Sequence, residues 1–411
     1  MKQKRYNIQF LLLALAISIW MLSSCVDRRE EMQVSASPCI EFGFQTLAVQ
    51  TRVAGTDENM RNEFKEGDSF GVFGYCVPLQ VGSTTPDYAA GSSVWVSKMT
   101  NSVPDVFYDQ KVTLNAEGVW QYDWENADSD FYNPKYWYTD GKDTEGKEVS
   151  GIISSQSYQY DFFAYYPYDA GIFTWERPAN RMHKGAPKVK VSIPQTGGDN
   201  MKLSDNPDAM LSVIYNYQRR ISSKLSFSFS HVFTALGFEV NNFSERNLRI
   251  HSLKVTGTFW KSLTVNFSTG NYTYNTDDTY TGTYVIFDEK EYGGTLELPA
   301  PAIGESVTSA KSPVGGEYLR LLPGGFNGGN FLGPVLADET KVIKLVVDYT
   351  FGTERKTARL SFPATFLPQP GTKYTSQFNF VGNAFVLQFI ENNSESWEDG
   401  GSDNNGDIIF E

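Results

Sequence analysis

The sequence is poor in cysteine, histidine and positive charge. Three cysteines in 411 residues are too few for a disulfide scaffold. The three histidines, His183, His231 and His251, stand at no metal-ligand spacing with one another. Basic residues number 35 against 48 acidic ones, and the net charge of −13 disfavours binding to nucleic acid or to an anionic membrane surface. The sequence therefore predicts an acidic protein with no metal and no cofactor.

Long apolar runs are missing as well, apart from one near the beginning. Residues 10–22, FLLLALAISIWML, follow Lys2, Lys4 and Arg5. A membrane-spanning helix needs about 20 apolar residues, whereas a basic start and a shorter apolar run are typical of a secretory signal. The next residues, LSSC at 22–25, are similar to a bacterial lipobox. This resemblance implies that residues 1–24 are a lipoprotein signal peptide and that Cys25 becomes a lipidated (palmitate-type) N-terminus; a signal peptide with an unrelated cysteine is the alternative.

Two cysteines remain beyond Cys25, namely Cys39 and Cys76. Nothing in the sequence brings these two positions together, so we expect two buried thiols. A single disulfide between them is the alternative.

Aromatic residues are abundant, and apolar and polar residues alternate in many short segments. Phe and Tyr favour half-buried pleated surfaces, and alternation with a period of two predicts β-strands. Gly, Asn, Asp and Pro separate these segments, which favours a sandwich or a barrel. The segments are 40–50, 69–77, 188–193, 224–233, 235–240, 249–259, 342–351 and 384–390. The sequence predicts an all-β protein.

The chain beyond the signal is long enough for two or three domains of ordinary size. The alternating pattern breaks between residues 215 and 223, before a strong new strand. We therefore predict a domain boundary within residues 215–223.

Motifs that carry chemistry are scarce. The sequence has no G-x-S-x-G elbow, and the glycine-rich LPGGFNGGNFLGP at 322–334 lacks the Lys-Ser/Thr of a phosphate loop. His231 lies inside an alternating segment, where a structural histidine is expected. Carboxylates are plentiful, but nothing singles out a pair for glycoside hydrolysis. The sequence predicts no catalytic residues and a protein that is not an enzyme.

The densest aromatic cluster lies at 120–140 and contains Trp120, Trp124 and Trp137. Exposed rings at these positions would stack on a glycan or on a partner protein. The alternative is that they pack in the core beneath a long loop.

Six segments, taken in order, resemble the Mfa-like fimbrillin family of Bacteroidales surface lipoproteins. They are EGDSFGVFGY (66–75), Trp120 with Trp137, DFFAYYPY (161–168), NPDAML (206–211), LSFSFSHVFTALGFEV (225–240) and GTKYTSQFNFVGNAFVLQFIENNSESW (371–397). The resemblance implies a lipidated leader with a removable first strand at 25–52 and two tandem transthyretin-like β-sandwich domains, the N-terminal one at 53–220 and the C-terminal one at 221–411. It also implies a lipid anchor in the outer membrane and assembly with other subunits into a surface-exposed fimbrium.

The family resemblance also gives a role to LAVQTRVAG at 47–55. In related fimbrillins an arginine-specific protease cleaves at this place and removes the lipidated leader with the first strand; here the cut would fall between Arg52 and Val53. The lost strand would contain Ile40, Phe42 and Phe44, followed by Leu47 and Val49. A strand donated by a neighbouring subunit would then fill the groove. The alternative is that Arg52 is an ordinary surface arginine.

The donor strand is harder to place. After Trp397 the chain is polar until Ile408, Ile409 and Phe410, which is short for a strand of about five to six residues. This shortness argues against a shaft role and leaves room for an anchor, accessory or tip subunit. The alternative function is a non-polymerising lipoprotein that adheres to host or bacterial surface ligands or binds glycans.

Overall fold

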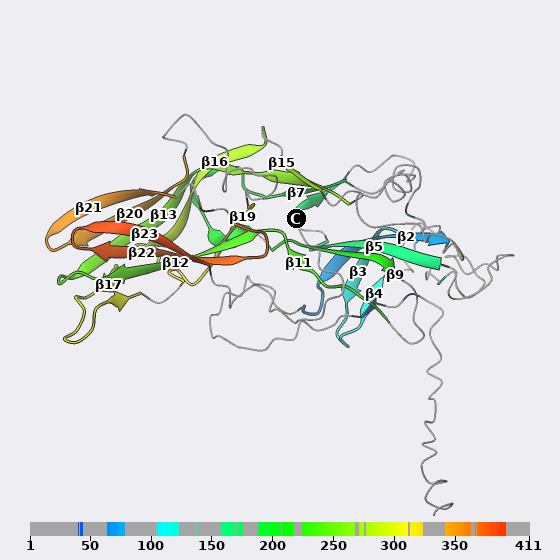
Figure 1. Cartoon of the computed structure of the whole chain (residues 1–411), viewed down its shortest axis with the longest axis horizontal. Coiled ribbons are helices and arrows are strands. Elements are labelled where there is room, and N and C mark those ends of the chain that lie inside the picture. Colours follow the sequence, from blue (N-terminus) through cyan, green and yellow to red (C-terminus); the bar gives the residue numbers. More distant parts are fainter. Residues whose placement is uncertain are drawn as a thin grey trace, which may run out of the picture. The chain divides into compact units, whose positions relative to one another are not determined.

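The computed structural model has a β-sheet architecture (Figure 1). It describes residues 40, 42–43, 64–78, 104, 106–122, 137, 158–168, 171–175, 188–206, 208–217, 224–267, 271–274, 277–310, 313–323, 342–362, 366 and 368–391. The predicted signal peptide, Cys25, Arg52, Val53 and Trp124 lie outside these residues. Within them, the helical structure is one turn of 3₁₀ helix, η2 (Leu203–Asp205), and no helix is long and apolar enough to cross a membrane.

The strands form four sheets. The eight-stranded sheet contains β1 (Phe42–Gly43), β2 (Ser69–Pro78), β3 (Phe107–Leu114), β4 (Trp120–Tyr122), β5 (Tyr158–Tyr166), β9 (Met210–Tyr217), β10 (Leu225–Ser226) and β11 (Ser230–His231). The four-stranded sheet contains β6 (Phe173–Thr174), β7 (Lys188–Ser192), β14 (Ser262–Asn266) and β15 (Asn271–Tyr274). The five-stranded sheet contains β12 (Thr234–Asn242), β18 (Thr308–Ser309), β19 (Leu319–Leu321), β22 (Lys373–Val381) and β23 (Ala384–Glu391). The six-stranded sheet contains β8 (Gly198–Met201), β13 (Leu248–Trp260), β16 (Thr279–Asp288), β17 (Leu296–Leu298), β20 (Lys344–Phe351) and β21 (Glu354–Ser361).

The eight-stranded sheet is strongly curled. Its order is β10-β1-β4-β3-β2-β5-β9-β11, so β10 and β11 lie at opposite ends of the hydrogen-bonded path. In a flat sheet these ends would be about 34 Å apart. The chain passes from Ser226 to Ser230 in four steps, which span at most about 14 Å. The two edges therefore approach each other, and the connecting Phe227 and Phe229 are buried inside the curl.

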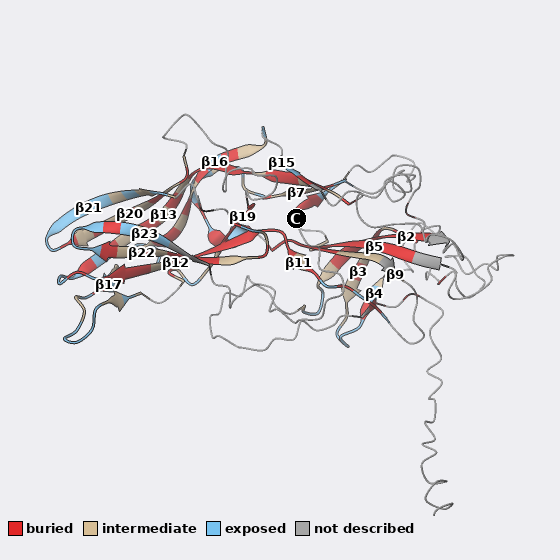
Figure 2. Cartoon of the chain, in the orientation of Figure 1, coloured by how far each residue is buried: buried red, intermediate tan, exposed pale blue. Residues whose placement is uncertain are grey.

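The outer side of the curl packs against the four-stranded sheet and forms a first sandwich. Phe163 of β5 stacks on Phe267 with ring centroids 4.8 Å apart, and Tyr165 lies 5.1 Å from Phe173. Strands β2 and β5 are consequently buried on both faces (Figure 2). This double burial explains why SFGVFGYCV and YDFFAYY have apolar residues at nearly every position instead of a simple alternation.

The five- and six-stranded sheets form a second sandwich. Across the space between them, Phe380 of β22 lies 4.8 Å from Phe351 and 5.6 Å from Tyr349 of β20. β20 alternates between half-buried and buried residues along its whole length, as expected for a strand with one face on a core. The predicted all-β fold with packed sandwiches is confirmed.

Strands from both sides of residue 220 share sheets. β14 pairs with β7, and β10 pairs with β1, although β10 and β14 follow residue 220 in the sequence. Every described strand belongs to one compact unit, which comprises residues 39–219 and 224–411. A domain boundary at 220/221 stays a prediction.

Candidate functional site

The segment around Phe42 occupies one position in the curled sheet, which we call the first-strand slot. The slot consists of Ile40 and β1 together with the strands on either side, β10 and β4. Phe42 pairs in parallel with Leu225 of β10 and antiparallel with Trp120 of β4. β1 therefore lies one strand in from the edge, and its loss would separate β10 from the rest of the sheet.

Aromatic rings surround Phe42, whose side chain is 2% exposed. Its ring centroid lies 5.7 Å from Phe70, 5.5 Å from Phe107, 5.8 Å from Tyr122 and 5.9 Å from Phe227. These rings come from β2, β3, β4 and the connection after β10, so a single side chain joins four parts of the core. Burying one such phenylalanine stabilises the fold by about 1.5–3 kcal/mol.

Ile40 is the second apolar anchor of the slot and is also buried. Tyr122 Oη donates a hydrogen bond to the Ile40 carbonyl oxygen at 3.2 Å, which holds the backbone just before β1. Ile40 and Phe42 are two residues apart, so both point to the same face of an extended chain. The prediction that these two residues share a buried face is confirmed, whereas Phe44, Leu47 and Val49 lie outside the described residues.

Removal of β1 would open both a sheet edge and an apolar cavity. Without β1, β4 would present unpaired backbone N–H and C=O groups along one side. Phe70, Phe107 and Phe227 would line an apolar cavity where the Phe42 ring now sits. An extended segment with apolar residues at alternate positions would satisfy both the hydrogen bonds and the cavity.

The sequence identified Ile40 and Phe42 but missed what lines the slot. Tyr122 and Phe227 contact Phe42, and no sequence pattern at either position predicts this contact. The alternation of Leu225, Phe227 and Phe229 predicts one apolar face. It does not say which strand that face covers, because a pairing between distant segments leaves no local pattern.

Two of the three tryptophans considered for glycan stacking lie in the core. Trp120 is 8% exposed and packs on Phe64 and Phe70 with centroids 5.3 and 5.1 Å away. Trp137 is 2% exposed and lies between Tyr160 and Tyr217. For these two rings the structure matches the core-packing alternative and not an exposed stacking surface.

The described histidines have structural partners. His231 Nδ1 lies 2.8 Å from Asp208 Oδ1, and both side chains are buried. His231 is thus the structural histidine that its strand pattern predicts. Among the described residues, no group of three or more His, Cys, Asp or Glu side chains is arranged to hold a metal ion.

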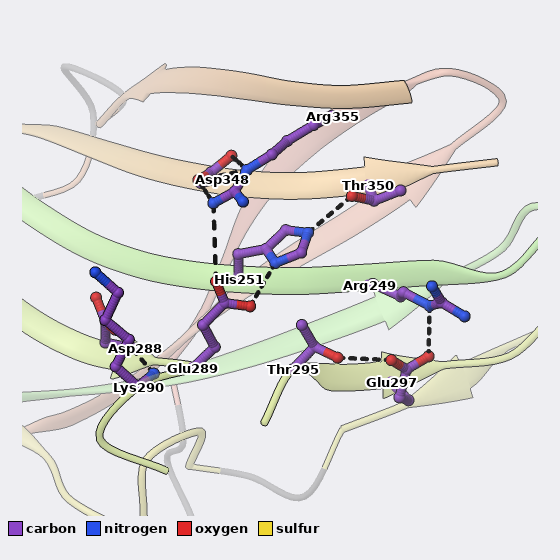
Figure 3. Close-up of polar contacts among 10 residues, drawn as sticks. All are labelled: Arg249, His251, Asp288, Glu289, Lys290, Thr295, Glu297, Asp348, Thr350 and Arg355. Atoms are coloured by element: carbon purple, nitrogen blue, oxygen red, sulfur yellow. Dashed lines mark hydrogen bonds and ion pairs between the residues drawn. The ribbon is translucent and has the colours of Figure 1, made fainter. Parts of the chain in front are cut away.

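A polar network covers the outer face of the six-stranded sheet (Figure 3). His251 is the extra residue of a β-bulge in β13, because Ile250 and Ser252 pair with consecutive residues of β20. The bulge directs its ring between Glu289 Oε2, 2.6 Å from Nδ1, and Thr350 Oγ1, 2.7 Å from Nε2. Arg355 forms a forked pair with Asp348 and approaches Glu289 at 3.9 Å. The network links the ends of β13, β16, β20 and β21.

Comparisons with known proteins agree with this architecture. No protein-family model matches the sequence, and no curated protein matches it significantly. A fimbrial protein from Bacteroides vulgatus ATCC 8482 superposes with a TM-score of 0.50 at 16% identity, covering 86% of this chain and 98% of that chain. At this identity the likeness shows a shared fold.

Two other solved structures match less closely. For a candidate cell adhesion protein from Bacteroides ovatus ATCC 8483 the TM-score is 0.36 at 14% identity, with 85% of this chain and 94% of that chain covered. For the tip fimbrial protein Mfa3 from Porphyromonas gingivalis, with a C-terminal truncation, the TM-score is 0.28 at 9% identity, with 79% and 93% covered.

Proposed function

We propose that this protein is a subunit of a cell-surface fimbria, exported as a lipoprotein through Cys25 and assembled by exchange of its first strand. The observation that carries the proposal is the first-strand slot, in which β1 inserts Phe42 among four aromatic rings. The shared fold with the Bacteroides vulgatus fimbrial protein supports the fimbrial role. The partners would be other fimbrial subunits and an arginine-specific protease that cuts after Arg52.

The slot also defines the donor that would replace β1. The donor strand must run antiparallel to β4 and parallel to β10 to restore both sets of backbone hydrogen bonds. It must also carry apolar side chains two residues apart, with an aromatic ring at the second position.

The C-terminus of the same sequence meets this requirement. Ile408 and Phe410 repeat the identity and spacing of Ile40 and Phe42. A donor of this length is short, but the side chains that fill the described slot are those of Ile40 and Phe42 alone. The C-terminal segment of one subunit would therefore enter the slot of the next.

The first test is the N-terminus of the protein recovered from native outer membranes. We expect mass spectrometry and N-terminal sequencing to find a form that begins at Val53. In Arg52→Ala, the acylated Cys25 form should persist and polymers should not form. Arg61→Ala, which removes a nearby arginine, is the control, and this variant should still be cleaved and form polymers. A protein that keeps the Cys25 N-terminus as its only form in the wild type would contradict strand removal.

The second test concerns the donor. Phe410→Ser should abolish polymers while the subunit keeps its unfolding temperature, because the ring is needed only in the neighbouring slot. Ile409→Ser is the matched control, since its side chain would point to the other face. Polymers of unchanged length from Phe410→Ser, seen by electron microscopy, would exclude the C-terminus as donor.

The alternative, a non-polymerising adhesin or glycan-binding lipoprotein, needs a surface other than Trp120 and Trp137, because both rings are buried. A glycan array with the full chain separates the two functions.

A further inference from the structure

β10 depends on β1 for its place in the curled sheet. It stands at the end of the hydrogen-bonded path, and among the described strands it pairs with β1 alone. Removal of β1 would therefore leave β10 without a strand partner beside an apolar cavity. Leu225 of β10 and the adjoining Phe227 are buried in the same core as Phe42, at 0% and 2% exposed. A segment in this position can itself fill the space that β1 leaves.

The direction of β10 is the one that a replacement for β1 needs. β10 runs parallel to β1, and β1 runs antiparallel to β4. β10 is consequently already antiparallel to β4. A sideways shift by one strand, about 4.8 Å, would bring the two strands into pairing distance without a reversal of the chain. With the register unchanged, the backbone of Leu225 would lie opposite Trp120, and that of Ser226 would follow opposite Val119.

The ring of Phe227 is placed to follow this shift. It stacks on the Phe42 ring with centroids 5.9 Å apart and planes 21° apart, a separation close to one strand spacing. Both rings also contact Phe70, whose centroid lies 5.5 Å from Phe227 and 5.7 Å from Phe42. The shift would thus carry the Phe227 ring towards the place of the Phe42 ring while it keeps its contact with Phe70.

The connection from β10 to β11 allows this movement. Downstream, Ser230 pairs with Leu211 of β9, and the Val232 N–H donates to the Ala209 carbonyl oxygen at 2.8 Å. β11 therefore stays on β9 when β10 moves. Residues 227–229 between the two strands belong to no strand themselves, so the backbone can bend there without breaking a ladder.

We infer that β10 closes the first-strand slot of the cleaved subunit until a donor strand displaces it. The inference rests on the proposed removal of β1 and adds a closed state before assembly. The shift moves the gap in the curled sheet from its interior to its two ends, so the edge of β4 stays covered. β10 is held by only two residue pairs, which makes it easy to displace. A donor must compete with it, so the donor's apparent affinity scales with the fraction of open subunits.

Disulfide trapping in the full chain tests the inference. Ile40→Asp together with Phe42→Asp should expel β1 from its apolar slot without proteolysis, so the result depends neither on cleavage nor on polymers. Charged residues are used because a shortened β1, as in Phe42→Ala, would still compete with β10 for the slot. Ser226→Cys and Val119→Cys add thiols at two exposed positions. With β1 between them these positions are about 9.6 Å apart, whereas a disulfide needs Cα atoms within about 7 Å.

We expect the disulfide between positions 119 and 226, mapped by mass spectrometry, to form about tenfold faster once β1 is expelled. The matched control carries the same two cysteine substitutions with the native Ile40 and Phe42. An added peptide covering residues 38–50 should compete with β10 and reduce the yield of the disulfide.

Two outcomes would overturn the inference. If the expelled chain forms no more disulfide than the control while the amides of β13 stay protected from hydrogen exchange, β10 does not move to β4. If both chains form it equally fast, the two positions meet without any shift. Phe42→Asp alone, which keeps Ile40, repeats the test should the double variant lose the protection of β13. Strand removal itself is judged separately, by the N-terminus of the native protein.

Discussion

The curled eight-stranded sheet and the second sandwich both enclose an apolar core, but their strands differ in length. Two strands of the curled sheet, β10 and β11, are only two residues long, and the described part of β1 is Phe42–Gly43. The central strands of the second sandwich, β12, β13 and β16, have nine to thirteen residues. The second sandwich is thus held by continuous backbone ladders. The curled sheet is closed by the aromatic side chains of Phe227 and Phe229, which lie in the segment between the short strands β10 and β11.

Two substitutions that remove a phenylalanine ring should cause the largest loss of stability and test this difference. Phe42→Ala and Phe378→Ala each remove a fully buried ring, and each should lower the free energy of unfolding by about 3–5 kcal/mol in urea titrations. The two should differ in where the structure loosens. In Phe42→Ala, the amides of β4 and β10 should exchange rapidly while those of β12 and β22 stay protected.

Phe378→Ala should speed the exchange of β12 and β22, which pair along eight residues, and leave β4 and β10 protected. Phe42→Ala should also bind an added peptide covering residues 38–50, which refills the slot. A loss below about 1 kcal/mol for Phe42→Ala would show that the ring does not hold the curled sheet together.

The same contrast explains which parts of the fold the sequence could predict. β20 alternates strictly because one of its faces is solvated, so periodicity located it at 342–351. β2 is buried on both faces, and its pattern shows a strand but not its neighbours. The curl itself depends on Phe227 and Phe229 crossing between two edges, a long-range arrangement that no local spacing encodes.

The candidate site follows the same rule. Ile40 and Phe42 could be identified as the buried face of a first strand from their spacing alone. The interior position of β1, between β10 and β4, could not, because β10 follows β1 by about 180 residues. The fate of Trp120 and Trp137 was undecidable for a related reason, since aromatic composition does not distinguish a core ring from an exposed one.

Substitution of two strand glycines by alanine should have an intermediate effect on stability. Gly71 of β2 lies directly beneath the ring of Tyr165, and Gly237 of β12 lies beneath the ring of Tyr318. Tyr165 is fully buried and its hydroxyl donates a hydrogen bond to Asp109 Oδ1 at 2.6 Å. Its ring therefore cannot shift away from a Cβ atom added at Gly71. Tyr318 is only partly buried and can swing outwards. Thermal unfolding should show Gly71→Ala destabilised by about 1–3 kcal/mol, and Gly237→Ala by less. Equal losses would mean that Tyr165 relaxes as easily as Tyr318.

The smallest effect concerns Asp278, which ties the four-stranded sheet together at one end. It accepts hydrogen bonds from Lys190 of β7 at 2.7 Å and from Ser262 of β14. These bonds, the one from Lys190 first, hold the pKa of its carboxyl below the ordinary value of 3.8. Because the folded-state pKa is lowered, the stabilisation is complete above the ordinary pKa. It is lost as the pH falls through the folded-state value.

Asp278→Asn should therefore lower the free energy of unfolding at pH 7 and have no effect at strongly acidic pH. The loss should be about 1 kcal/mol or less, because the Lys190 side chain is 42% exposed and water screens the pair. Urea titrations at pH 7 and near pH 2.5 measure it, with the exposed Asp199→Asn as control. A difference that persists unchanged at the lower pH would assign the effect to packing and not to the ionised carboxylate.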